Sequence, residues 1–292
     1  MCVIWGVPYL LIRVAVSELT PASLVLLRTS IGAVLLLPVA LARGELHPLL
    51  ASWRPVLVYT AVEVAIPWFL LSDAETRLSS SLSGLLVAAV PLVGALLAWV
   101  TRSQHRLDAR RVAGLGVGLA GVAILVGLDV SVRDLGAVGE VGLVTVGYAT
   151  GPMIISRWLS RLPSVGVVAV SLTLSAVVYA PAGILQLGGK HLTANVLASA
   201  ATLGVVCTAV AFLLFFALIA EIGPVRSTVI TYFNPAVALL LGVLVLHEPL
   251  TVGAVAGFAL ILCGSFLATR SRSPLPPARV EVERASPDHA LP

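Results

Sequence analysis

The stretch VRSTVITYFNPAVALLLGVLVLHEPLTVGAVAGFALILCGSFLA, residues 225–268, decides the fold, because it joins two long apolar runs by a short polar break. From Ser227 to Leu246 no residue carries a formal charge. About 20 residues at a rise of about 1.5 Å each cross a hydrocarbon core of about 30 Å. A second such run, from Thr251 to Ala268, follows the break HEPLT at 247–251. The stretch therefore predicts a membrane hairpin of two α-helices.

The same pattern occurs earlier in the chain, where Leu82–Val100 is followed by a polar segment and then by Val112–Gly127. Pro91 and Pro235 are 144 residues apart, and a separation of 143 residues relates Leu107 to Leu250, Gly114 to Gly257 and Gly121 to Gly264. The offset also places Trp5 on Tyr148, Arg13 on Ser156, Arg28 on Ser171 and Pro38 on Pro181. The sequence therefore predicts two repeats of five spans each.

The composition excludes a water-soluble globular protein. Hydrophobic residues make up 59% of the 292 residues and charged residues 11%, whereas soluble domains carry about 25% charged residues. The net charge of +4 does not indicate a nucleic-acid partner, because the arginines lie in short loops and form no basic face with stacking aromatics. The predicted surroundings are a lipid bilayer.

Apolar runs broken by Pro, Gly and charge predict an all-α integral membrane protein with ten transmembrane helices. The expected spans are 2–17, 22–42, 55–74, 79–101, 109–127, 136–156, 164–187, 194–219, 225–246 and 250–269. The first is several residues short, which leaves open a start upstream of Met1 or a bilayer thinned at that end. We expect a first repeat at 1–127, a second at 136–269 and a disordered cytoplasmic tail at 270–292, where Ser, Pro and charge replace the apolar pattern.

Basic residues near the helix ends predict the orientation, because Lys and Arg are retained in cytoplasmic loops. With both termini in the cytoplasm, three basic residues lie outside: Arg77, Arg133 and Lys190. Eleven lie inside: Arg43, Arg54, Arg102, Arg106, Arg110, Arg111, Arg157, Arg161, Arg226, Arg270 and Arg272. Because each repeat has an odd number of spans, the two insert with opposite topology, as in many secondary transporters.

These residues resemble the ten-helix EamA-type members of the drug/metabolite transporter superfamily over about residues 3–269. The markers are Trp5-Gly6 with Arg13, Pro21 with Arg28, Pro91, Gly114 to Gly121, Ile222-Gly223-Pro224, Asn234-Pro235, Leu241-Gly242, the break at 247–251, Gly257 and Gly264. The sequence departs from the family pattern at Arg13, where Lys is frequent, and at Gln104-His105-Arg106-Leu107, where a Glu is usual, so that the Glu role carries over only to Glu248.

The resemblance implies a multi-pass inner-membrane carrier, often an exporter of amino acids or other small metabolites, with the substrate path between the two halves. An integral membrane enzyme acting on lipid-linked substrates is the alternative from another class. Such an enzyme needs clustered His, Asp or Glu at one membrane face, and none is seen. The resemblance implies no cofactor, and the scattered histidines offer no metal-ligand spacing.

Charged residues inside the apolar runs are few, namely Arg13, Arg28 and Glu63. Such residues usually face a cavity or a partner, because burying one costs about 2.5–3.5 kcal/mol on insertion scales. Arg28 is a candidate for binding an anionic substrate group. Glu63 is a candidate proton carrier, because desolvation near mid-membrane favours the neutral carboxyl. The structural alternatives are a permanent Arg28–Glu63 ion pair and an Arg13 side chain that reaches the interface.

Other residues of the expected substrate pathway are aromatic or polar: Trp5, Trp68, Tyr148, Tyr232 and Asn234. For Tyr148, Tyr232 and Asn234 two roles are open: lining a cavity, or forming a hydrogen bond to a neighbouring helix. Pro67 leaves the Glu63 carbonyl without its usual donor, next to Trp68.

Two further motifs have a structural interpretation. Gly116-Val117-Gly118-Leu119-Ala120-Gly121 matches GxGxxG but lies within a spanning helix, so it predicts close helix packing. Glu248 is expected to cap a helix or to lie in a loop.

Overall fold

The computed structural model describes residues 1–101, 109–189, 191–223 and 230–269. Within these residues, eight helical segments are long and apolar enough to cross a membrane, and two apolar helices are shorter. The expected loop residues 102–108, the start of the ninth span and the tail at 270–292 lie outside the described residues. The prediction of an all-helical membrane protein is confirmed.

The first half contains α1 (Cys2–Ala15), α2 (Pro21–Ala42), α3 (His47–Leu50), α4 (Trp53–Tyr59), η1 (Thr60–Ala65), α5 (Ile66–Ala74), α6 (Ser80–Val87), α7 (Val90–Val100) and α8 (Ala109–Asp129). The second half contains η2 (Val132–Asp134), α9 (Leu135–Ile154), η3 (Ile155–Leu159), α10 (Ser164–Leu187), α11 (Ala194–Gly204), η4 (Val205–Val210), α12 (Ala211–Ile222), α14 (Ile230–Val245) and α15 (Val252–Thr269). The span boundaries agree with the expected ones to within a few residues, and the short helix α3 was not predicted.

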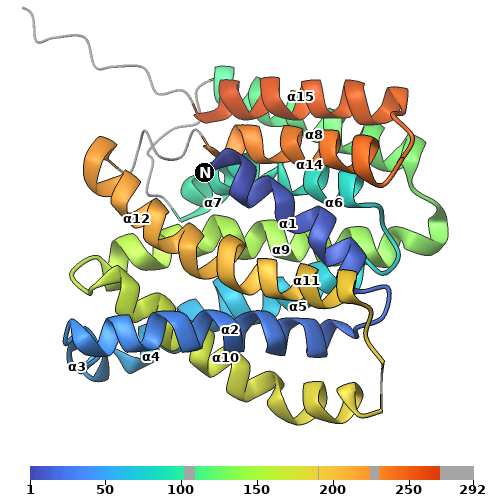
Figure 1. Cartoon of the computed structure of the whole chain (residues 1–292). Helices are drawn as coiled ribbons and strands as arrows, with labels where there is room; N and C mark the ends of the chain where they lie inside the picture. The colour runs from blue at the N-terminus through green and yellow to red at the C-terminus, as the bar shows by residue number, and fades with distance from the viewer. Residues whose placement is uncertain (102–108, 190, 224–229, 270–292) are drawn as a thin grey trace, which may run out of the picture.

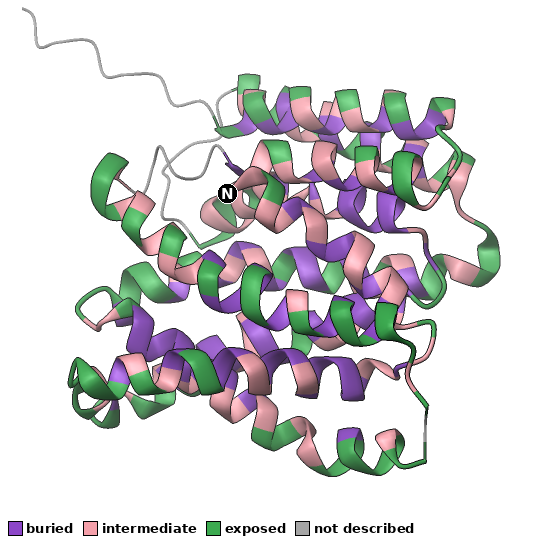
Figure 2. Ribbon diagram, viewed as in Figure 1, coloured by how far each residue is buried: buried purple, intermediate pink, exposed green. Residues whose placement is uncertain are grey.

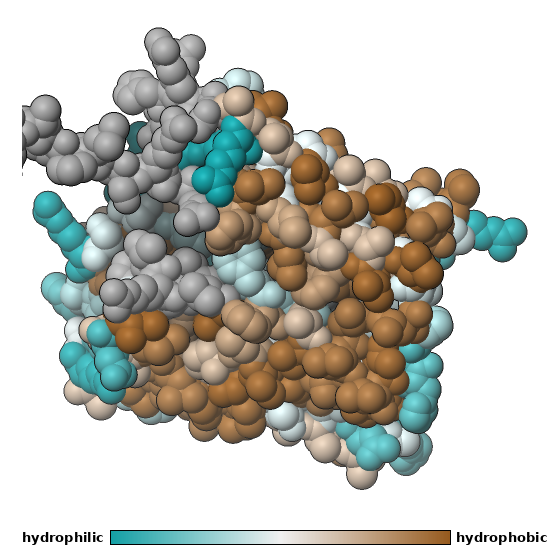
Figure 3. Space-filling view, turned by 90° about the horizontal axis from the view of Figure 1, so that it is seen from above, coloured by the Kyte–Doolittle hydropathy of each residue, from teal (hydrophilic) through white to brown (hydrophobic). Residues whose placement is uncertain are grey.

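The helices lie side by side in one bundle, with loops at two opposite ends (Figure 1). Buried residues follow the faces that turn toward the centre of this bundle, and the outer faces of α15, α12 and α10 are largely exposed (Figure 2). Seen from above, apolar side chains cover the middle of the molecule and hydrophilic ones gather at the two ends (Figure 3). This apolar belt is the surface that a bilayer covers.

The helix contacts repeat across the two halves. The most extensive contacts join α2 to α10 and α8 to α15, which are the second and the fifth spans of each half. The first span α1 packs on α14 and α11, and its counterpart α9 packs on α6 and α5. These contacts of the first half have equivalents in the second, in agreement with a sequence repeat at an offset of 143–144 residues.

Glycine allows the close contact between α8 and α15. A Cβ added at Gly114 would lie 2.6 Å from the Ala268 nitrogen, and one at Gly121 would lie 2.8 Å from the Gly257 carbonyl oxygen. At Gly118 an added Cβ would overlap the side chain of Leu92. Gly116, by contrast, has open space around it. The packing interpretation of this motif is confirmed for the glycines that face a neighbour.

Side chains from the loops after α1 and α2 cap the N-termini of two other helices. The carboxylate of Glu45 accepts a hydrogen bond from the Gly166 nitrogen at 2.8 Å, in the first turn of α10. Glu18 accepts one from the Thr193 nitrogen at 2.8 Å, at the start of α11. The first N–H groups of a helix have no intrahelical partner, and the helix dipole favours an anion there. These contacts therefore position helices relative to one another as well as capping them.

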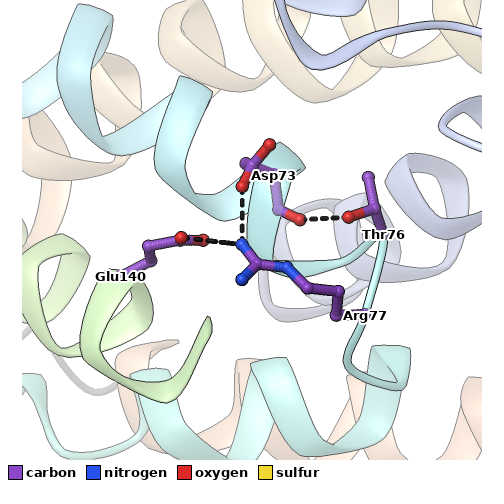
Figure 4. A network of polar contacts seen from close by, with 4 residues as sticks. All are labelled: Asp73, Thr76, Arg77 and Glu140. Atoms are coloured by element: carbon purple, nitrogen blue, oxygen red, sulfur yellow. Dashed lines mark hydrogen bonds and ion pairs between the residues drawn. The ribbon is translucent and has the colours of Figure 1, made fainter. Parts of the chain in front are cut away.

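At the end of the bundle where α5 stops, a polar network joins it to α9 (Figure 4). Arg77 contacts Asp73 at 2.6 Å and Glu140 at 2.7 Å, and Thr76 donates to the Asp73 carbonyl oxygen at 2.6 Å. The Arg77 side chain is 36% exposed. Exposed ion pairs contribute less than about 1 kcal/mol each, so this network mainly orients the loop after α5.

Candidate functional site

One π-helical turn interrupts the third span of each half. The two turns are η1 (Thr60–Ala65) and η4 (Val205–Val210), which lie 145 residues apart. Pro67 explains η1, because it cannot donate a backbone hydrogen bond to the preceding turn. No proline lies within 205–222, so the sequence carries no comparable signal for η4. π-turns occur frequently at functional sites.

Hydrogen bonds join each π-turn to the second span of the other half. Arg28 Nε on α2 donates to Thr208 Oγ1 in η4 at 3.0 Å. On the opposite side, Thr60 Oγ1 in η1 donates to Ser171 Oγ on α10 at 2.9 Å. Arg28 and Ser171 are the positions that the repeat offset superposes. The two contacts therefore use equivalent positions of the second span, of which only the one in the first half carries a charge.

The guanidinium group of Arg28 contacts Thr208 and Trp68 through Nε and through its planar face. Its Cζ lies 3.6 Å from the centre of the Trp68 ring, a cation–π arrangement, and the residue is 8% exposed. The Thr208 hydroxyl that accepts from Nε itself donates to the Leu203 carbonyl oxygen at 2.8 Å. Among the described residues, the two Nη atoms have no hydrogen-bond partner. An arginine fork in this state is suited to bind a carboxylate or a similar anion.

Two tyrosines lie near Arg28. Tyr148 on α9 interacts with the Trp68 side chain, and Arg28 is within electrostatic range of both Tyr9 and Tyr148. Tyr9 is buried, and Tyr148 is half-buried between the two hydrophobic cores. The structure thus brings together Arg28, Trp68 and Tyr148, all of which were predicted, and adds Tyr9 and Thr208, which were not.

Glu63 is close to this cluster but does not pair with Arg28. Its carboxyl group packs against Gly151 on α9, where an added Cβ would overlap the Oε2 atom. Oε2 is buried and forms no hydrogen bond in the described part of the chain. The ion pairs found there do not include Arg28 with Glu63. The structural alternative of a permanent Arg28–Glu63 ion pair is therefore wrong, because Arg28 contacts Trp68 and Thr208, whereas the Glu63 carboxyl group packs on α9.

Arg13, in the last turn of α1, bonds to the residue that directly follows α5. Its Nη1 donates to the backbone carbonyl oxygen of Glu75 at 2.5 Å, in a part-buried position. This contact joins α1 to the end of α5. Glu75 itself is fully buried. It directly follows the predicted third span, so the sequence suggested a loop residue, and nothing in the pattern indicated its burial.

The other predicted pathway residues lie elsewhere. Trp5 packs on Phe215 and Phe212, with ring centres 4.7 Å and 5.9 Å away. In its hydrogen-bonding orientation, the Asn234 amide donates to the Cys2 carbonyl oxygen at 3.1 Å. The Tyr232 hydroxyl bonds to Thr269 Oγ1 at 2.9 Å. The interhelical alternative therefore describes Asn234 and Tyr232 better than cavity lining does.

Glu248 is a capping residue, as predicted, and it caps a helix of the other half. Its Oε1 and Oε2 accept hydrogen bonds from the Ser80 and Ser81 nitrogens at 2.8 Å and 2.9 Å, at the start of α6. The chain reaches this point through His247, whose φ of 55° lies in the left-handed region. An added Cβ at Gly242 would overlap both Ser81 and the Glu248 carboxylate.

We predict that Glu248→Ala lowers thermal stability by an amount typical of a lost helix cap, about 1–2 kcal/mol. The variant leaves two N–H groups at the start of α6 without an acceptor. Melting of the purified protein in detergent measures the effect, and Glu221→Ala, at an exposed glutamate near the end of α12, is the matched control. Equal melting temperatures for the two variants would contradict the capping role.

A cavity of about 230 Å³ lies beside this cap, at the end of the bundle where α6 begins. Its lining includes Arg77, Ser81, Asp129, Glu248 and Thr251. It does not reach Arg28. Within the described ranges, no group of three or more His, Cys, Asp or Glu residues is placed to hold a metal ion.

The chain is similar to known transporters along nearly its whole length. It is 26% identical to the transporter YvbV of Bacillus subtilis over 90% of this chain and 87% of that protein. It is 23% identical to a transporter of Archaeoglobus fulgidus (92% and 95%) and 27% identical to the inner membrane transporter YedA of Escherichia coli K12 (82% and 78%). A crystal structure at 24% identity, covering 92% of this chain and 94% of that one, superposes with a TM-score of 0.67 and shows the same fold.

A family model decides the assignment. The model of the EamA-like transporter family matches twice, at residues 1–127 and at residues 141–270. The two matches cover most of the chain and correspond to the two sets of equivalent helix contacts. This multi-pass membrane protein therefore belongs to the EamA-like transporter family.

Proposed function

We propose that this transporter is a secondary carrier that exports small metabolites, such as amino acids or related compounds, across the inner membrane. The observation that carries the proposal is Arg28, a buried cation at the junction of the two halves whose Nη atoms have no hydrogen-bond partner in the part of the chain that the structure describes. An anionic group of the substrate would supply the missing acceptors. The alternative of an enzyme acting on lipid-linked substrates is not pursued, because the chain belongs to a transporter family.

Transport and substrate class can be tested together. Cells lacking or overproducing the protein are screened against toxic amino acids, nucleobases and drugs, and the resistance profile names the substrate class. The compound is then offered to liposomes containing the purified protein, with and without an imposed gradient. A carrier gives saturable, gradient-dependent accumulation, whereas a channel gives no accumulation against the substrate gradient.

The path is proposed to run between a first repeat at 1–127 and a second at 136–269, inserted with opposite topology. The contacts α2–α10 and α8–α15 support this division, because each joins equivalent spans. Rocking of one half against the other would expose Arg28 alternately to the two sides. The π-turns η1 and η4 are positioned to absorb such a movement, because each bonds to the opposite half.

The proposed orientation places both termini in the cytoplasm, as the excess of arginine in the loops requires. Single cysteines at positions 102–111, 157–163 and after Arg270 should react in intact cells only with a membrane-permeant reagent. A cysteine in the 131–134 segment serves as the comparison and should react with an impermeant one. Ready labelling of the tail by the impermeant reagent would reverse the orientation.

We propose proton coupling through Glu63, whose carboxyl group packs on α9 without a hydrogen bond to Oε2. In liposomes, a pH gradient alone should drive uphill movement of the substrate by the parent protein. Glu63→Gln should abolish uphill movement but retain downhill exchange, because it keeps the shape of the neutral acid and cannot release a proton. Glu140→Gln is the control, because Glu140 lies in the same bundle but its side chain is partly exposed. Uphill movement by Glu63→Gln at the parent rate excludes Glu63 as the coupling group.

A further inference from the structure

Glu75 is a second buried carboxyl group that the proposed mechanism does not use. It follows the last residue of α5 and is fully buried. Neither Oε1 nor Oε2 has a hydrogen-bond partner among the residues that the structure describes. The neighbouring Leu71, Ala74 and Leu78 belong to a hydrophobic core that also contains Ile12 and Leu85. Burial raises the pKa of the Glu75 carboxyl group well above its usual range, although the charges of Arg13 and Arg28 act in the opposite direction.

The charged and titratable groups around Glu75 come from four elements. Arg13 and Tyr9 lie on α1, Arg28 on α2, Tyr148 on α9, and Glu248 in the loop after α14. Arg13 is the nearest cation, but its guanidinium group bonds to the Glu75 backbone carbonyl oxygen, not to the carboxyl group.

Glu248 makes a negative charge on Glu75 less favourable. Two backbone N–H groups at the start of α6 donate to the Glu248 carboxylate, whereas no group in the described part of the chain donates to the Glu75 carboxyl group. Two neighbouring carboxyl groups rarely ionise together, and the one without donors retains the proton. Of this pair, that residue is Glu75.

We propose that Glu75 is a proton-binding site, protonated in the conformation described here and ionised when α1 and α6 separate at this end of the bundle. On separation the proton passes to solvent water, and Arg13, which already contacts the same residue, becomes the counter-ion of the carboxylate. The open form therefore binds one proton fewer than the closed form. Raising the pH favours opening, by up to about tenfold per pH unit.

Protonation of Glu75 does not depend on the proposed transport function. Only its consequence, a proton-dependent closure of this end of the bundle, rests on that function. Glu63 would couple substrate movement, whereas Glu75 would couple the conformational change. Glu63 lies in the π-turn η1 and Glu75 directly follows α5, so that α5 separates the two carboxyl groups along the chain.

Infrared spectroscopy tests the protonation directly and needs neither substrate nor transport. The carbonyl stretch of neutral carboxyl groups is recorded at pH 7 in a Glu63→Gln background. We expect a band that is lost when Glu75→Gln is added and that is unchanged by Glu140→Gln. If Glu63→Gln and Glu63→Gln/Glu75→Gln have the same band intensity, Glu75 is ionised and the proposal is overturned. A positive result stands even if transport proves not to be coupled to protons.

Thiol reactivity tests the link to opening. In a protein whose Cys2, Cys207 and Cys263 are replaced, Ser81→Cys reports on the cavity beside α6, and Ser131→Cys gives the ordinary pH dependence of an exposed thiol. The rate at which the Ser81→Cys thiol reacts, divided by the rate for Ser131→Cys, should rise with pH when Glu75 is present. With Glu75→Gln this ratio should be independent of pH. An unchanged rise in the Glu75→Gln protein would show that another group controls the opening.

Discussion

Replacing Arg28 with glutamine is expected to raise the substrate concentration that half-saturates transport about 10- to 100-fold. A hydrogen bond to a charged group contributes about 1.5–3 kcal/mol, and each 1.4 kcal/mol is a factor of ten in affinity. Glutamine can retain a polar contact with Thr208 but offers no charged fork to an anion. The protein should still reach the membrane, because the variant removes a buried charge and leaves the packing of α2 on α10 in place.

Two further variants separate the charge from the stacking. Arg28→Lys keeps the charge but loses the bidentate geometry and the planar contact with Trp68, so it should recover only part of the affinity. Arg54→Gln is the matched control, because Arg54 also stacks on a tryptophan, Trp53, at 5.2 Å, but in an exposed position. If Arg28→Gln transports with the parent's half-saturating concentration, Arg28 has a structural role only.

Gly264→Leu is expected to cause the largest loss of stability among single changes in the contact between α8 and α15. An added Cβ at Gly264 would overlap the backbone of Gly118 and would lie 2.6 Å from the Gly114 carbonyl oxygen. Backbone atoms cannot move aside as a flexible side chain can. Overpacking costs about 1–3 kcal/mol and more where a backbone must shift, so we expect the melting temperature to fall by on the order of 10 °C.

Gly116→Leu is the control for this prediction. Gly116 lies on the same helix α8, two residues from Gly114, and nothing approaches its Cβ position within 4 Å. The added side chain would face the bilayer, so the melting temperature should stay near that of the parent or rise. Size-exclusion profiles of the heated, detergent-solubilised protein measure both variants. Equal losses for Gly264→Leu and Gly116→Leu would mean that helix propensity or insertion, not the contact with α15, sets the cost.

The sequence alone predicted the number and order of the spans. Each span shows up as an apolar run of sufficient length, and lipid imposes that length on any helix that crosses it. The internal offset of 143–144 residues also indicated the repeat, and the family model matches the chain twice, at residues 1–127 and 141–270. Close helix packing at the glycines of α8 was predicted, because only small residues permit that spacing, but the partner helix α15 was not.

The partners of the charged residues were not predictable. Helix rise alone allowed an Arg28–Glu63 pair, but rotation of the helices about their axes directs Arg28 to Thr208 and Trp68, and Glu63 to Gly151. Hydropathy reports how deep a residue lies along a span and says nothing about which neighbouring helix it faces. The π-turns rotate the third spans further, and only η1 has a proline to indicate it.

The sequence by itself determined that this chain is a repeated, all-helical membrane protein with a few charges inside its spans, because a bilayer selects on local composition. Only the tertiary structure decided that Glu75 is buried, that Arg13 bonds to its carbonyl oxygen and that Glu248 caps a helix of the other half. These contacts join residues 62 to 168 positions apart in the chain. Their energies depend on which helices meet at the same end of the bundle, and packing, not local pattern, sets that arrangement.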